Sequence, residues 1–131
     1  MKKITISGSA KLQDKINNWR DYFKKLEYEI LDYPKPIDSK HFMELYPEIH
    51  RKYFENISNS DILFIMNEDK NGIEGYIGAE TYAELAYAVI QNLNYGKNID
   101  VVLLKMPSNK IQCYDEIKLW LELGWIKLYK E

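Results

Sequence analysis

Asp61-Ile62-Leu63-Phe64-Ile65-Met66 is the stretch of this sequence that decides the fold. After its first residue the run is wholly apolar and lacks the alternation of polar and apolar side chains that marks a strand with one face in water. Strands with this composition are covered by helices on both faces and are typical of parallel sheets. The stretch therefore predicts an inner strand of a parallel sheet.

On either side of this run, short apolar stretches alternate with segments of helical pattern. Four further strands are expected at residues 3–7, 28–31, 99–104 and 125–129. Helices are expected at residues 11–27, from a cap at Asp38-Ser39 to about 46, and at 47–57, 78–94 and 112–123. The boundary at Pro47 is placed there because proline fits the first turn of a helix. This alternation predicts one α/β domain over residues 1–131, a flavodoxin-like (Rossmann-like) fold with a five-stranded parallel sheet of order 2-1-3-4-5.

The composition excludes several classes of partner. Apolar residues make up 46% of the chain, and its 18 basic and 20 acidic residues are interspersed, with a net charge of −2. Because the sequence has no basic stripe and no long apolar segment, we expect neither a nucleic-acid partner nor a membrane. The lone Cys113 cannot form an internal disulfide, which favours a reducing compartment and a cytoplasmic location.

The sheet order predicts where a ligand binds. In open α/β sheets ligands lie beyond the carboxyl ends of the strands, where the strand order reverses. In the order 2-1-3-4-5 this point is next to Ser7-Gly8-Ser9 and the polar segment 67–84. The first segment offers hydroxyl and backbone N–H groups for an anion or a sugar, although such residues often form only a strand-to-helix turn.

No metal or cofactor is expected at this edge. The acidic residues Glu68, Asp69 and Glu74 match no known calcium loop and are interpreted as a solvated loop. His41 and His50 are not spaced as a metal-binding pair, and we expect both on helix surfaces.

The helix expected at residues 78–94 carries two glutamates near its start. At about 100° per residue, one apolar face is predicted to pack on the sheet, formed by Tyr82, Leu85, Ala86, Val89 and Ile90. Glu80 and Glu84 share the other side, with Thr81 nearby. Both are either solvated or directed at a ligand held at the helix start.

The segment from Asn59 to Ala88 resembles the nucleoside 2-deoxyribosyltransferase family and its relatives that hydrolyse deoxynucleoside monophosphates. In that family an (A/N)-D-(I/V) strand leads through a glycine-containing loop to a helix reading E-L-G-x-A. Glu84-Leu85-Ala86-Tyr87-Ala88 matches this pattern except that Ala86 replaces the glycine. The opening residues 4–9 and Gly96-Lys97 are similar to further parts of the family pattern.

The resemblance implies a cleaved or transferred N-glycosidic bond in a nucleoside or nucleotide, with Glu84 attacking the anomeric carbon. Tyr53, Asp69 and Glu55 are the candidate proton donors to the leaving base. The residues expected to bind the substrate are Ser7, Gly8, Ser9, Asn67, Gly78, Glu80 and Thr81. Members of the family assemble into dimers or larger rings, so a homo-oligomer is expected.

Two departures from the family pattern keep a second hypothesis open. Thr5 stands where the family has a tyrosine that positions the nucleophile, and Tyr53 stands where it has an aspartate that acts on the leaving base. A non-catalytic module that binds or senses a nucleotide on the same scaffold is therefore the alternative to an enzyme.

Overall fold

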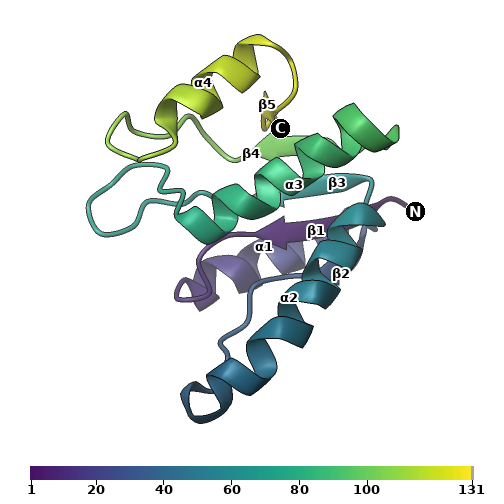
Figure 1. Cartoon of the computed structure of the whole chain (residues 1–131), viewed down its shortest axis with the longest axis vertical. Coiled ribbons are helices and arrows are strands. Elements are labelled where there is room, and N and C mark those ends of the chain that lie inside the picture. The colour runs from purple at the N-terminus through teal and green to yellow at the C-terminus, as the bar shows by residue number, and fades with distance from the viewer. Residues whose placement is uncertain (131) are drawn as a thin grey trace.

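The structure, a computed structural model, describes residues 1–130 (Figure 1). Within these residues strands and helices alternate as the sequence predicts. The elements in chain order are β1 Lys3–Ser7, α1 Gln13–Lys25, β2 Glu29–Asp32, the short 3-10 helix η1 Ser39–His41, α2 Phe42–Ser58, β3 Ile62–Ile65, α3 Ala79–Tyr95, β4 Asp100–Leu103, α4 Tyr114–Glu122 and β5 Lys127–Leu128.

The five described strands form one parallel sheet of order β2-β1-β3-β4-β5. Ile4 of β1 pairs with Ile62 of β3, which in turn pairs with Asp100 of β4. The predicted flavodoxin-like order is confirmed. β3 is an inner strand, and Leu63, Phe64 and Ile65 are at most 1% exposed, as their apolar run indicates.

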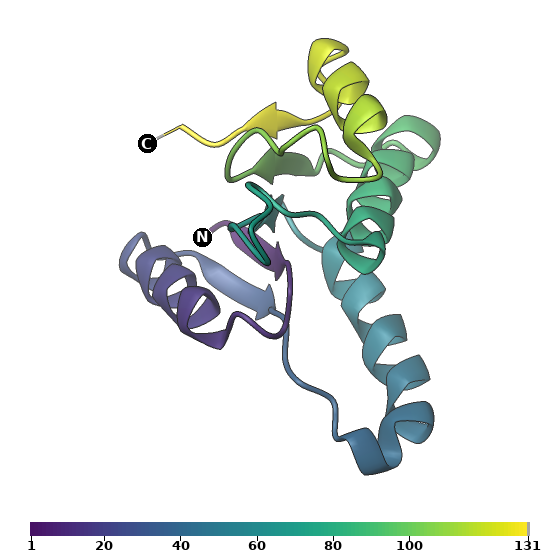
Figure 2. The same cartoon turned by 90° about the vertical axis from the view of Figure 1, so that its left-hand side faces the viewer.

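Helices cover both faces of the sheet, but unequally. Figure 2 shows α1 on one face and α2, α3 and α4 on the other. The larger core lies under α2, α3 and α4 and includes Ile57, Leu85 and Ile117. The smaller core lies under α1 and includes Ile16, Phe23 and Phe64. Since Leu63 belongs to the first core and Phe64 to the second, β3 needs apolar side chains on both faces.

α2 is one continuous helix of 17 residues, so the predicted break at Pro47 is wrong. Proline cannot donate the backbone hydrogen bond to the carbonyl four residues earlier, here that of Met43. This carbonyl lies in the first turn of α2, where the Met43 side chain is 81% exposed. Water can solvate the carbonyl at such a site, so the helix continues through Pro47. Its first half projects beyond the sheet (Figures 1 and 2).

α3 presents a different face to the sheet from the one predicted. Its buried residues are Thr81, Glu84, Leu85, Ala88 and Val89, whereas Ile90 is 45% exposed. The helix is therefore turned toward β1 and α2 and buries Glu84, which the apolar pattern alone assigned to the opposite side. No helix within residues 1–130 is long and apolar enough to cross a membrane.

Candidate functional site

A cavity of about 820 Å³ opens at the carboxyl ends of β1 and β2, beside the point between β1 and β3 where the strand order reverses. Its walls come from the Gly8–Ser9 turn, the segment after β2, the inner side of α2 and the first turns of α3. The cavity lies where the sheet order predicts a ligand site.

Glu84 lies at the base of this cavity. Its side chain is 5% exposed, and its carboxyl group accepts a hydrogen bond from the hydroxyl of Ser7 at the end of β1. Burial raises the pKa of Glu84 to about 7, the Ser7 hydrogen bond opposes the rise, and the nearby carboxylates of Glu80 and Asp32 add to it. A carboxyl group that is buried, hydrogen-bonded and near its protonation midpoint at neutral pH is typical of catalytic sites.

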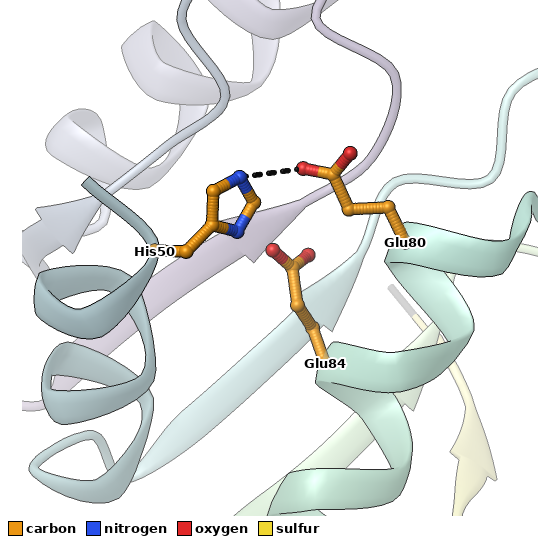
Figure 3. A group of neighbouring side chains, drawn as sticks. All are labelled: His50, Glu80 and Glu84. Carbon is orange, nitrogen blue, oxygen red and sulfur yellow. Dashed lines mark ion pairs between the residues drawn. The ribbon is translucent and has the colours of Figure 1, made fainter. Parts of the chain in front are cut away.

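His50 and Glu80 form a second pair at the cavity wall. Nε2 of His50 lies 3.0 Å from Oε1 of Glu80, and the side chains are 12% and 63% exposed. Figure 3 shows the imidazole of His50 facing both glutamates of α3, with its other ring nitrogen on the side of Glu84. The expectation that His50 lies on the surface of a helix is wrong, because α2 turns it toward α3.

An aromatic row fixes the orientation of His50. Its ring is stacked on that of Tyr46, with 4.0 Å between centroids, and Phe54 lies one turn farther along α2. Phe42, Tyr46, His50 and Phe54 are four residues apart, so they share one side of the helix. Tyr46 also lines the cavity.

Asp32, at the carboxyl end of β2, is a cavity residue that the sequence analysis missed. It is 8% exposed and accepts hydrogen bonds from the backbone N–H of Tyr33 and the side-chain amide of Asn56, both at 2.9 Å. Lys35 lies 3.2 Å from it. A signal exists in the sequence, since Asp32 ends the strand expected to lie beside the first one.

Lysines also line the cavity. Nζ of Lys70 donates to Oγ of Ser9 at 2.9 Å, and Lys11 and Lys35 also line the wall. A Cβ at Gly8 would lie 3.0 Å from the carbonyl oxygen of Met66, so glycine permits the close approach of the β1 turn to β3. The cavity thus has a cationic rim and an acidic base.

Most of the predicted site residues are brought together here. Those that line the cavity are Gly8, Ser9, Tyr53, Gly78, Glu80, Thr81 and Glu84. Ser7 is fully buried behind Glu84, so it contacts the carboxyl group and not the cavity. Thr5 also lies away from the cavity and shares a 2.8 Å hydrogen bond with Ser60.

Tyr53 borders the cavity but directs its hydroxyl away from it. The phenol is 7% exposed and donates its hydrogen bond to the backbone carbonyl of Ile6. Burial raises its pKa well above the ordinary value, and the carboxylates of Glu84, Asp32 and Glu80 add to the rise. This hydroxyl is therefore a weak acid that is already bound to the backbone.

Asn67 and Asp69 lie apart from the other predicted site residues. The side-chain amide of Asn67 donates to the backbone carbonyls of Gly75 and Lys105, at 3.3 and 2.7 Å. Asp69 accepts from Lys105 and from the backbone N–H of Gly75, both at 2.9 Å, and these contacts lower its pKa. Both residues hold the loop between β3 and α3 against β4.

Among the described residues, His50, Glu80 and Glu84 each offer one potential metal-ligand atom, and these atoms lie within 4.8 Å of one another. In this arrangement Nε2 of His50 pairs with Glu80, and the carboxyl group of Glu84 accepts from Ser7. The same three groups are suited to proton transfer and nucleophilic attack, because an imidazole and two carboxylates face one cavity.

Three kinds of group line the cavity: lysines and Ser9 at the rim, carboxylates at the base, and the rings of Tyr33, Tyr46 and Tyr76 along the walls. The arrangement can perform acid–base and nucleophilic chemistry on a small polar ligand. Searches of protein-family models and of curated proteins find no match for this chain.

Proposed function

We propose that this protein cleaves or transfers the N-glycosidic bond of a nucleoside or nucleotide, with Glu84 as the nucleophile. One observation supports this most: a carboxyl group that is 5% exposed lies at the base of a cavity of about 820 Å³, at the reversal point of the sheet. Burying a glutamate destabilises the protein, because desolvation opposes its charge, so a buried glutamate in a cavity indicates a functional role. The resemblance of residues 84–88 to the family motif E-L-G-x-A suggests that this role is nucleophilic attack.

The proposed reaction proceeds in two steps with retention at the anomeric carbon. In the first, ionised Glu84 forms a C–O bond to this carbon as the C–N bond breaks and its electron pair leaves with the base. The Ser7 hydroxyl orients the carboxylate and stabilises its charged form. In the second, water or another base attacks the glycosyl ester and releases Glu84.

Complementary surfaces support a nucleotide as the substrate class. Lys70 and Ser9 at the rim offer a cation and a hydroxyl for a 5′-phosphate. Aromatic rings along the wall offer a face on which a base can stack. Asp32 and Glu80 can accept hydrogen bonds from sugar hydroxyls.

The test is a panel of the common deoxynucleosides and their 5′-monophosphates, incubated with the protein and analysed by chromatography for free base. We expect release by the wild type and a loss of at least ~10³-fold in Glu84→Gln, since the amide is not a nucleophile. Glu29→Gln is the matched control, because Glu29 is exposed on the edge strand β2. Base release by Glu84→Gln at the wild-type rate would contradict the proposal.

The alternative is a nucleotide-binding or sensing module without turnover. The raised pKa of Glu84 favours it, because a protonated carboxyl group can donate a hydrogen bond to a ligand but cannot attack carbon. In that case no base is released or exchanged from any member of the panel. A nucleotide that binds would still raise the melting temperature.

We also propose a homo-oligomer. The projecting half of α2 exposes Phe42, Met43, Leu45 and Ile49, which are 40–81% exposed. A group of large apolar side chains on one helix is typical of a contact surface. Analytical ultracentrifugation measures the state directly, and Met43→Glu, placed at the most exposed of these positions, should shift it toward the monomer.

A further inference from the structure

The proposed N-glycosyl reaction needs a proton for the leaving base, and the candidates drawn from the sequence do not supply one well. The hydroxyl of Tyr53 is bound to the backbone carbonyl of Ile6, and its pKa is raised. Asp69 is paired with Lys105 outside the cavity, and Glu55 is bound by Arg51 on the outer side of α2. The donor must therefore be another group that faces the cavity.

We propose that His50 is the catalytic acid and base of this site, and that Glu80 is its positioning residue. This inference rests on the proposed N-glycosyl reaction. His50 lies on the same helix as Tyr53, one turn earlier, and lines the cavity that Glu84 closes from below. Imidazole is the side chain best suited to exchange protons near neutral pH.

The distance between the two groups is too short for an inverting mechanism. A potential donor atom of His50 and a carboxylate oxygen of Glu84 lie within 4.8 Å of each other. In retaining glycosidases the nucleophile and the acid are about 5–5.5 Å apart, whereas inverting enzymes need about 6.5–9.5 Å to admit a water molecule. The upper limit of 4.8 Å lies well below the inverting range and just under the retaining one.

The surroundings of His50 hold it in one orientation. Stacking on Tyr46 fixes the plane of the ring, and Nε2 lies 3.0 Å from Oε1 of Glu80. With Nε2 occupied in this way, Nδ1 is the nitrogen that can transfer a proton. Figure 3 shows this nitrogen on the Glu84 side, where the reacting bond would lie. A carboxylate behind an imidazole fixes its tautomer and stabilises its cation.

The proton is accounted for in both steps. As the C–N bond breaks, Nδ1–H of the His50 imidazolium protonates the departing base, and His50 becomes neutral while Nε2–H stays with Glu80. In the second step Nδ1 accepts a proton from the attacking water, or from the N–H of an acceptor base, as the bond to Glu84 breaks. Both side chains return to their starting states.

The test compares leaving groups that differ in their need for a proton. 7-Methyl-2′-deoxyguanosine carries a positive base that departs without protonation, whereas 2′-deoxyguanosine needs a proton. 5-Fluoro-2′-deoxyuridine and 2′-deoxyuridine form the corresponding pyrimidine pair, since fluorine stabilises the departing anion. Each compound is assayed with and without its 5′-phosphate, so that purine and pyrimidine preferences are both covered.

We expect His50→Asn to lower kcat/KM on the unactivated member of the accepted pair by about 10²–10⁴-fold. On the activated member the loss of kcat/KM should stay below about ten-fold, because its base departs with little help from an acid. Glu80→Gln should show the same selectivity at smaller amplitude. The ratio between the two members does not depend on the folded fraction, since unfolding lowers both rates equally.

His41→Asn is the matched control. His41 makes a similar contact, with Nδ1 2.9 Å from Asp38, but its side chain is 56% exposed and it does not line the cavity. This variant should retain wild-type rates on both members of the pair. All assays are repeated in EDTA, and activity is expected to be unchanged.

Three results would overturn the proposal. The first is an equal loss of kcat/KM on both members of the pair in His50→Asn, which would mean that His50 is structural. If Glu84→Gln also abolished cleavage of both members in that case, the proposed glycosyl reaction would still stand without His50. Loss of activity in EDTA that Zn²⁺ or Mg²⁺ restores would assign the three side chains to a metal. If the wild type cleaves no member of either pair, the proposed function is wrong, and the role proposed for His50 is wrong as well.

Discussion

The hydroxyl of Ser7, at the end of β1, donates a hydrogen bond to the carboxyl group of Glu84, 77 residues later on α3. This contact joins the two segments that flank the reversal point of the sheet. It also opposes the effect of burial on the pKa of Glu84 and so favours the ionised form.

Burial of the Glu84 carboxyl group should make the free energy of unfolding depend on pH. The folded pKa of about 7 lies above the ordinary 4.5, so between these values the unfolded chain releases the proton while the native protein retains it. The wild type should therefore lose up to about 3 kcal/mol of unfolding free energy as pH rises from 4.5 through 7. Glu84→Gln should not lose it. Urea unfolding at several pH values measures this, with Glu29→Gln as the control, and parallel curves for Glu84→Gln and the wild type would exclude a buried charge.

Ser7→Ala should move the acidic limb of the pH–activity profile to higher pH. In the wild type this limb of kcat/KM should have its midpoint near 7, because the nucleophile must be ionised in the free enzyme. Without the hydroxyl, the ionised form loses a hydrogen bond and the pKa rises further. Base release measured from pH 5 to 9 shows the shift. An unchanged midpoint in the variant would mean that the Ser7 hydroxyl does not affect the pKa of Glu84.

Tyr53→Phe should reduce stability more than activity. The hydroxyl satisfies the carbonyl of Ile6 in a buried site, so its removal is expected to cost about 1–2 kcal/mol. The rate of base release should stay within a few-fold of the wild type, since the proton donor in this account is His50. A loss of two orders of magnitude at unchanged stability would instead return Tyr53 to the catalytic group.

Two glycines in the loop between β3 and α3 should respond differently to alanine. Both have positive φ, 73° at Gly72 and 60° at Gly75. A Cβ at Gly75 would lie 2.8 Å from Cα of Pro107, whereas one at Gly72 would contact nothing within 4 Å. Gly72→Ala should cost roughly 1 kcal/mol for the backbone conformation alone. Gly75→Ala should cost at least ~1 kcal/mol more for the overlap, and equal losses in urea unfolding would contradict this packing.

Sheet order and element sequence were predictable because they depend on local patterns. The apolar run 61–66 indicates a strand covered on both faces, and the alternation of strands and helices restricts the connections. The position of the site followed from the order of the strands. Glu84 was found through its resemblance to a family motif, since the apolar pattern of α3 placed it on the outer side.

The missed residues depend on packing that periodicity does not define. Dividing α2 at Pro47 separated Tyr46 from His50 and concealed the row of aromatic residues four apart that turns His50 inward. Asp32 follows a four-residue strand, and its role depends on β2 lying beside β1. Rotation of α3 by a fraction of a turn buried Glu84 and exposed Ile90. Because Glu84 is buried, Glu84→Gln, which keeps the size of the side chain, is a better test variant than Glu84→Ala.

Covalent attack by Glu84 is the central claim, and trapping the glycosyl ester tests it most directly. A 2′-deoxy-2′-fluoroarabinosyl nucleoside or nucleotide with an accepted base should react, because the fluorine slows release of the ester by destabilising the positively charged transition state. Intact-mass spectrometry should show the protein plus one fluorinated sugar, and peptide analysis should place it on Glu84. An adduct on a different residue, or release of base from this compound at the unmodified substrate's rate without any adduct, would contradict the account.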